Sequence, residues 1–346
     1  MTTARDIAAR LNLSVSTVGR ALADDRRISA ETKLRVQQTA DELGYVVNRA
    51  ARMMRGARSP VVGLVVPDVR NSFYSTVAHA LTETLGAQHH QVMLCETGDD
   101  KQSELRQIRD LAAAQVSGVV IVPTAKPLPD VARLLQPIPH VQFLRQVNSL
   151  GPHWFGIDDR RVIEMATEHL VGLGHRRIGF IGGTADVPTS AARLAGFNAA
   201  ASAGGVLKDD RLPVLGPPSS SDFGASALQQ LMSGPHPPTA VVSGSVQVTR
   251  GMLEHVHSAG LDVPEFVSLV GFGDEAGFAW WGPGLTTISL PMHDMATACG
   301  TWLMRQISSA DGGGNANAAG SSQPPYSSIS PGVLVERGST RAHASA

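Results

Sequence analysis

The chain has 346 residues, 42% of them hydrophobic, and a formal net charge of −1, which suits two or three compact units. It has no apolar run of about 18 residues and no basic start followed by an apolar stretch, so we expect neither a membrane span nor a secretory signal. Cys95 and Cys299 lack metal-binding or CxxC spacing, which favours two reduced thiols in a cytoplasmic protein with no metal or cofactor.

The charge is unevenly distributed along the chain. Residues 1–58 hold eleven Lys and Arg against six Asp and Glu, whereas the remainder is acidic. A small basic head on an acidic body is typical of a protein whose head binds a polyanion. A chance fluctuation in charge would give the same pattern.

The first residues predict two short helices joined by a tight corner. Residues 5–11 form an amphipathic pattern, Asn12 tolerates a left-handed corner, and Ser14 can cap a second helix over 15–22. Small Ala8, flexible Asn12 and apolar Val18 have the spacing of a helix-turn-helix, whose second helix enters the DNA major groove.

A third helix is expected to complete this head. Ser29 can cap it and Gly44 can end it. Its expected buried positions are Leu34, Val36, Ala40 and Leu43.

The second helix carries the candidate DNA contacts. Val15 can touch a thymine methyl, Ser16 and Thr17 can bond to bases or phosphates, and Arg20 can pair with guanine or phosphate. The alternative is a generic three-helix cap with a solvated polar face.

A basic, alanine-rich segment, 48–56, follows the head. An isolated helix of that length is marginal in water, so DNA and a second copy of the chain would have to order it. Met54 would then be an apolar wedge in the minor groove, and the arginines would hold phosphates. The alternative is a plain basic linker.

The body alternates predicted strands and helices in two series, which indicates two doubly wound lobes with parallel sheets. Ligands bind such lobes in the crevice at the carboxyl ends of the strands. Residues 308–329 are low in complexity and are expected to form a loop, before a last strand over 333–335.

These features strongly resemble the lactose-repressor (LacI/GalR) family. The segments that carry the resemblance are 6–8, 14–20, 42–45, 48–56, 63–68, 174–178, 193–197, 270–274, 285–288 and 334–340. They cover nearly the whole chain in order. Gly19 and Val47 depart from the family pattern, which normally has serine and proline there.

The resemblance implies an all-α helix-turn-helix headpiece and an α/β, two-lobed, type-I periplasmic-binding-protein-like core. We expect a headpiece over 1–47, a hinge over 48–59 and the core over 60–340. The N-lobe would hold about 60–157 and 286–307, and the C-lobe about 158–285 and 330–340.

The family resemblance also implies a function. It implies a non-enzymatic repressor that binds double-stranded operator DNA as a homodimer and is allosterically controlled by a small-molecule effector. The implied DNA-binding residues are Ser14, Val15, Ser16, Thr17, Arg20, Tyr45, Asn48, Arg49 and Met54.

The expected effector-binding residues are Phe73, Tyr74, Arg145, Arg193 and Asp274. The expected effector is a sugar, a sugar acid or a related carboxylate. Several polar positions common in the family are absent here, which favours a less sugar-like or anionic effector held by Arg145 and Arg193. The alternative is that both arginines form internal salt bridges.

Two rival functions share the body's pattern. A solute-binding protein would need a signal peptide and has no use for residues 1–58. An α/β enzyme would need a catalytic constellation, which the sequence does not offer.

Overall fold

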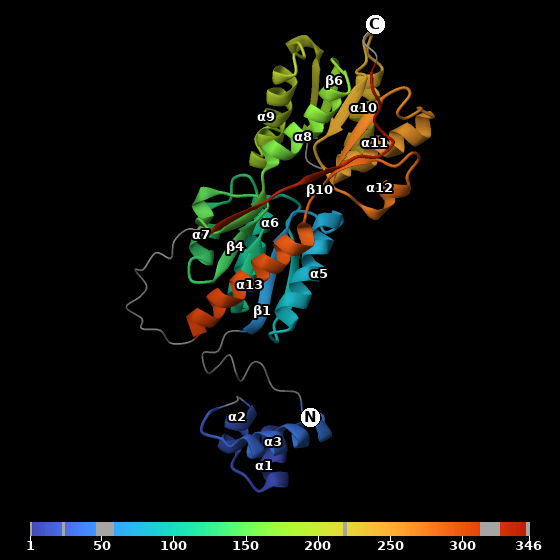
Figure 1. Ribbon diagram of the computed structural model, residues 1–346. Helices are drawn as coiled ribbons and strands as arrows, with labels where there is room; N and C mark the ends of the chain where they lie inside the picture. Colours follow the sequence, from blue (N-terminus) through green and yellow to red (C-terminus); the bar gives the residue numbers. More distant parts are fainter. Residues whose placement is uncertain (1, 23–24, 46–58, 217–219, 312–325, 344–346) are drawn as a thin grey trace. The chain divides into compact units, whose positions relative to one another are not determined.

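The computed structural model describes residues 2–22, 25–45, 59–216, 220–311 and 326–343 (Figure 1). The chain divides into two compact units, Met1–Ser59 and Pro60–Ala346. The predicted hinge, 48–59, lies outside the described residues apart from Ser59, as do Asn48, Arg49 and Met54.

The first unit is a three-helix headpiece: α1 (Ala4–Leu11), α2 (Val15–Leu22) and α3 (Ala30–Glu42). Asn12 takes the expected left-handed conformation, with φ 52°, and ends α1. The Ser14 and Ser29 side chains accept hydrogen bonds from the Thr17 and Thr32 backbone amides, so both cap the helices that follow them.

The headpiece core is small. It is built from Ile7, Ala8, Val18, Ala21, Val36 and Ala40. The prediction that Leu34 is buried is wrong, because Leu34 is 59% exposed. It lies two residues before Val36, and at about 100° per residue that spacing places it on the other face of α3.

The second unit holds two six-stranded sheets. Figure 1 shows helices on both sides of them. The first sheet has the order β11-β5-β4-β3-β1-β2 and the second the order β12-β10-β9-β8-β6-β7. The first sheet's strands are β1 (Ser59–Val66), β2 (Gln91–Glu96), β3 (Val116–Ile121), β4 (His140–Phe143), β5 (Trp154–Ile157) and β11 (Ser327–Ser330). The second sheet's strands are β6 (Ile178–Gly183), β7 (Arg211–Gly216), β8 (Ala240–Ser243), β9 (Ser268–Phe272), β10 (Thr286–Ser289) and β12 (Val333–Val335).

Helices connect these strands in both lobes. The first sheet is accompanied by α5 (Ser72–Gly86), α6 (Lys101–Ala113), α7 (Pro129–Leu135) and α13 (Met292–Asp311). The second is accompanied by α8 (Asp159–Gly172), α9 (Pro188–Ala203), α10 (Ser221–Met232), α11 (Val246–Ala259) and α12 (Ala276–Trp280). Two short 3-10 turns, Asn148–Leu150 and Lys208–Asp210, complete the described elements.

The lobe boundaries near the C-terminus differ from those expected. β10 was assigned to the N-lobe, but it pairs with β9 and β12 and therefore belongs to the second sheet. Residues 308–311 and 327–329 of the predicted loop belong instead to α13, which extends to Asp311, and to β11, which begins at Ser327. β11 pairs with β5, so the last crossing from the first lobe to the second lies between β11 and β12.

Candidate DNA-reading face and effector cleft

The exposed face of α2 carries the predicted DNA-reading residues. Val15 is 46% exposed, and Ser16 and Arg20 are also exposed, whereas Val18 is fully buried on the opposite face. The helix therefore presents one apolar, one hydroxyl and one cationic side chain together, which suits contacts to base edges and phosphates.

Ser14 organises the start of this helix. The Thr17 amide donates to Ser14 Oγ at 3.0 Å, and the Ser16 and Thr17 hydroxyls each lie 2.8 Å from the same oxygen. Tyr45 is half-buried and packs against the headpiece core. Ser14 is thus a capping residue, and Tyr45 stabilises the headpiece that presents α2.

A cleft of about 550 Å³ lies where the strands of both lobes end. Tyr74 and Arg145 line it, together with residues that follow β1, β2 and β3. Thr184, Asp186 and Val187 contribute from the second lobe, after β6. Both lobes thus contribute to a cleft at the carboxyl ends of parallel strands, where α/β folds bind ligands.

The charge of Arg145 is not available to a ligand in this cleft, because the guanidinium is paired. It is 9% exposed, and its Nη1 and Nη2 donate to the two carboxylate oxygens of Asp99 at 2.5 and 3.0 Å. Burial alone would lower the pKa of Arg145, but Tyr74 and Asp99 raise it above its ordinary value. The guanidinium is therefore charged and neutralised by a bidentate partner.

Arg193 is paired in the same manner. Its Nε donates to Asp159 Oδ1 at 2.7 Å and its Nη1 to the Gly244 carbonyl at 2.7 Å. The guanidinium carbon lies 4.1 Å from the Phe272 ring centre. Burial raises the pKa of Asp159 although Arg193 opposes this shift. The alternative of internal salt bridges therefore describes both arginines in this structure.

Phe73 and Asp274 line a different cavity, of about 640 Å³, with Arg250 and Glu275. The Phe73 ring lies 6.0 Å from that of Phe272, which carries Arg193 on its face. The structure therefore divides the predicted effector residues between two cavities, with Arg193 and Phe272 forming a contact next to Phe73.

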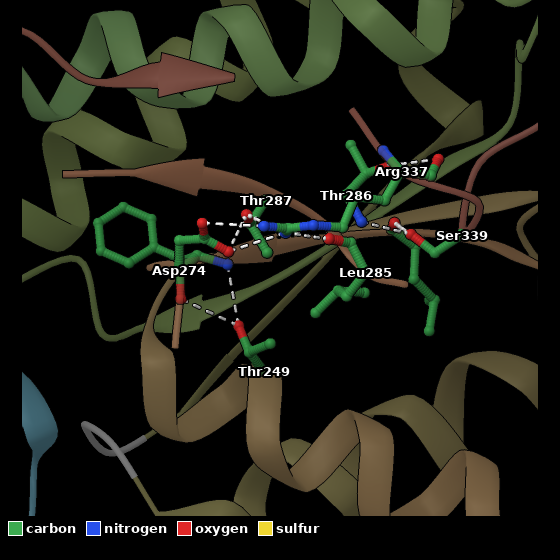
Figure 2. Close-up of polar contacts among 9 residues, drawn as sticks. Thr249, Asp274, Leu285, Thr286, Thr287, Arg337 and Ser339 are labelled. Carbon is green, nitrogen blue, oxygen red and sulfur yellow. Dashed lines mark hydrogen bonds and ion pairs between the residues drawn. The ribbon is translucent and has the colours of Figure 1, made fainter. Parts of the chain in front are cut away.

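Both oxygens of Asp274 are already used within its lobe. Arg337 Nη1 and Nη2 donate to them at 2.8 and 3.0 Å, and the Thr287 hydroxyl donates at 2.9 Å (Figure 2). Burial would raise the pKa of Asp274, but these hydrogen bonds hold it below its ordinary value. Asp274 thus ties the loop after β9 to the residues that follow β12.

Sequence reasoning missed Asp99, Asp159 and Arg337, the partners of the three predicted charged residues. Asp99 lies 46 positions from Arg145 and follows Gly98, in a turn with φ 58°. A Gly-Asp turn at a strand end is the one local signal that could have drawn attention to it. No group of His, Cys, Asp or Glu among the described residues could hold a metal ion, and no helix there could span a membrane.

The headpiece and the two-lobed body together define a class of protein: a helix-turn-helix unit joined to a two-lobed α/β core. Residues 3–48 match the family described as bacterial regulatory proteins, lacI family, and residues 167–340 match the periplasmic binding protein-like domain. The chain belongs to the lacI family of transcription regulators.

Two curated Escherichia coli (strain K12) proteins are similar along most of the chain. The transcriptional regulator GalR is 28% identical over 86% of this chain and 87% of its own length. The transcriptional repressor CytR is 28% identical over 98% of this chain and 96% of its own length.

Solved structures share the fold. The lac repressor dimer bound to operator and the anti-inducer ONPF has a TM-score of 0.81 at 21% identity, covering 99% of both chains. The transcriptional regulator CelR in complex with cellobiose has a TM-score of 0.70 at 24% identity, covering 98% of this chain and all of that one.

Proposed function

We propose that this chain is a repressor that binds operator DNA as a homodimer and is controlled by a small polar metabolite in the cleft between its lobes. The observation that carries the proposal is the exposed row Val15, Ser16 and Arg20 on a helix whose other face is buried. Relatives named as transcription regulators support it.

Exposed apolar side chains on the body support a homodimer. Met93 and Leu94 are 45% and 47% exposed on β2, an edge strand of the first sheet, and Trp280 is 79% exposed at the end of α12. An unpaired edge with large apolar side chains favours pairing with another chain. Sedimentation of the full chain should give twice the mass of the chain.

The pairing of Arg145 and Arg193 bears on the effector class. Of the expected sugar, sugar acid or related carboxylate, the anionic ones would be held by these two arginines, but each arginine already has a carboxylate partner. A carboxylate effector would have to displace Asp99 or Asp159, which would leave a buried charge without its partner. A neutral sugar or similar hydroxylated metabolite fits the described cleft better.

A gel-shift experiment tests the proposed function. The full chain should shift a selected duplex in the presence of random competitor DNA, and a chain beginning at Pro60 should not, because it lacks α2. Equal shifts from both proteins, or none from either, would contradict it. A solute-binding protein or an enzyme would give no shift. The hinge wedge formed by Met54 stays a prediction from the sequence.

A further inference from the structure

The ion pair between Arg145 and Asp99 is the charged contact at the wall of the cleft. Arg145 also donates from Nη1 to the Pro123 carbonyl at 3.2 Å, so three acceptors hold the guanidinium in place. Its side chain is 11% exposed and that of Asp99 is 20% exposed. An incoming ligand therefore meets a neutral pair rather than a cation.

The turn after β2 sets Asp99 in this position. Gly98 and Asp99 both have left-handed backbones, with φ 63° and 58°, and the Asp99 amide donates to Thr97 Oγ1 at 3.3 Å. Aspartate tolerates this conformation better than most residues. The turn thus brings a carboxylate from the end of β2 to an arginine that follows β4.

The charged residues that line the cleft do not attract anions, taken together. Its lining holds four carboxylates, those of Asp68, Glu96, Asp99 and Asp186, against the two arginines Arg70 and Arg145. Asp68 accepts two hydrogen bonds from the Arg70 guanidinium and one from the Arg70 backbone amide, but the Arg70 side chain is 82% exposed and water screens it. Arg145 is therefore the one buried cation among the lining residues named for this cleft.

We propose that Asp99 is a specificity-determining residue: by neutralising Arg145 it excludes carboxylate- and phosphate-bearing metabolites from the cleft and reserves it for neutral ones. The proposal deepens the function proposed above, because it assumes that the cleft is the effector site. If the carboxylate is removed, Arg145 keeps the Pro123 carbonyl as an acceptor but loses the carboxylate that pairs with its charge, and a small anion is the chemistry that replaces it.

The test compares the full chain with its Asp99→Asn variant, using inorganic phosphate as the probe at constant ionic strength. Asparagine keeps the shape of the side chain and one acceptor for Arg145, but it removes the charge. Phosphate should stabilise the variant against heat and bind it at least about tenfold more tightly than the wild type, since a hydrogen bond to a charged group contributes about 1.5–3 kcal/mol. Calorimetric titration measures the affinity.

Two further variants separate this effect from general changes in charge. Asp68→Asn removes the same charge from the same cleft but releases only the exposed Arg70, so it should gain no affinity for phosphate. Adding Arg145→Met to Asp99→Asn should abolish the gain. If Asp99→Asn does not fold, Asp99→Ser replaces it in the same comparison.

Three results would overturn the proposal: no gain in Asp99→Asn, an equal gain in Asp68→Asn, or a gain that survives loss of Arg145. These titrations involve no DNA. A failed gel shift would therefore reject the proposed function and leave this result standing, and a failed titration would do the reverse.

Discussion

Truncation of Ile7 should unfold the headpiece while the two-lobed body stays folded. Ile7 is fully buried in a core in which three of the six buried side chains are alanines. Ile→Ala in a packed core costs about 2–5 kcal/mol. A unit of about 45 residues has a total stability of about 2–7 kcal/mol, so Ile7→Ala removes most of it.

Limited trypsin digestion followed by mass spectrometry measures this effect. Ile7→Ala should expose cleavage sites in the headpiece and lose DNA binding, whereas the body keeps its own unfolding midpoint because it is a separate compact unit. Leu34→Ala is the matched control, since Leu34 belongs to the same unit but is 59% exposed, and should cost less than about 0.5 kcal/mol. Equal losses in the two variants, or simultaneous unfolding of the body, would refute the reasoning.

Three other changes have defined outcomes. Arg20→Ala removes an exposed cation from α2 and should weaken binding to a selected duplex by about 1–3 kcal/mol in fluorescence anisotropy at fixed salt; unchanged affinity would remove Arg20 from the interface. Burial lowers the pKa of His175 from 6.5 to about 4. Between these pH values the imidazole is protonated in the unfolded chain but neutral in the folded chain. The free energy of unfolding therefore falls as the pH drops from about 6.5 to 4. His175→Gln should reduce this acid loss, which is up to about 3 kcal/mol, in urea unfolding at pH 7 and pH 5; an identical loss would assign it to other groups. Gly251→Ala would place a methyl group 1.8 Å from the Ser221 carbonyl and should destabilise the packing of α10 on α11, whereas Gly86→Ala meets nothing within 4 Å and should be tolerated; equal urea midpoints would contradict the close approach.

Local signals in the headpiece sequence were sufficient to predict its helices. Asn12 adopts the expected left-handed conformation, and Ser14 and Ser29 cap the helices that follow them. These features depend on residues three or four positions apart, which the sequence displays directly. Leu34 was misplaced because apolar character was given more weight than its angular position on α3.

Long-range contacts in the body could not be predicted in this way. The alternation of strands and helices indicated two parallel sheets, but not that β10 pairs with β9. The partners of Arg145 and Arg193 lie 46 and 34 positions away, and that of Asp274 lies 63 positions away. The fold decides which carboxylate pairs with which arginine, and these pairs set the electrostatics of the cleft.

The most direct measurement of the central claim is the selection of binding sites from a random duplex library by the full chain, followed by sequencing. A homodimer that reads DNA with α2 should enrich a two-fold symmetric site, and Arg20→Ala should alter the enriched bases or abolish the enrichment. A library that emerges unenriched, or one that the chain beginning at Pro60 enriches equally, would contradict the claim that this face of the headpiece reads DNA.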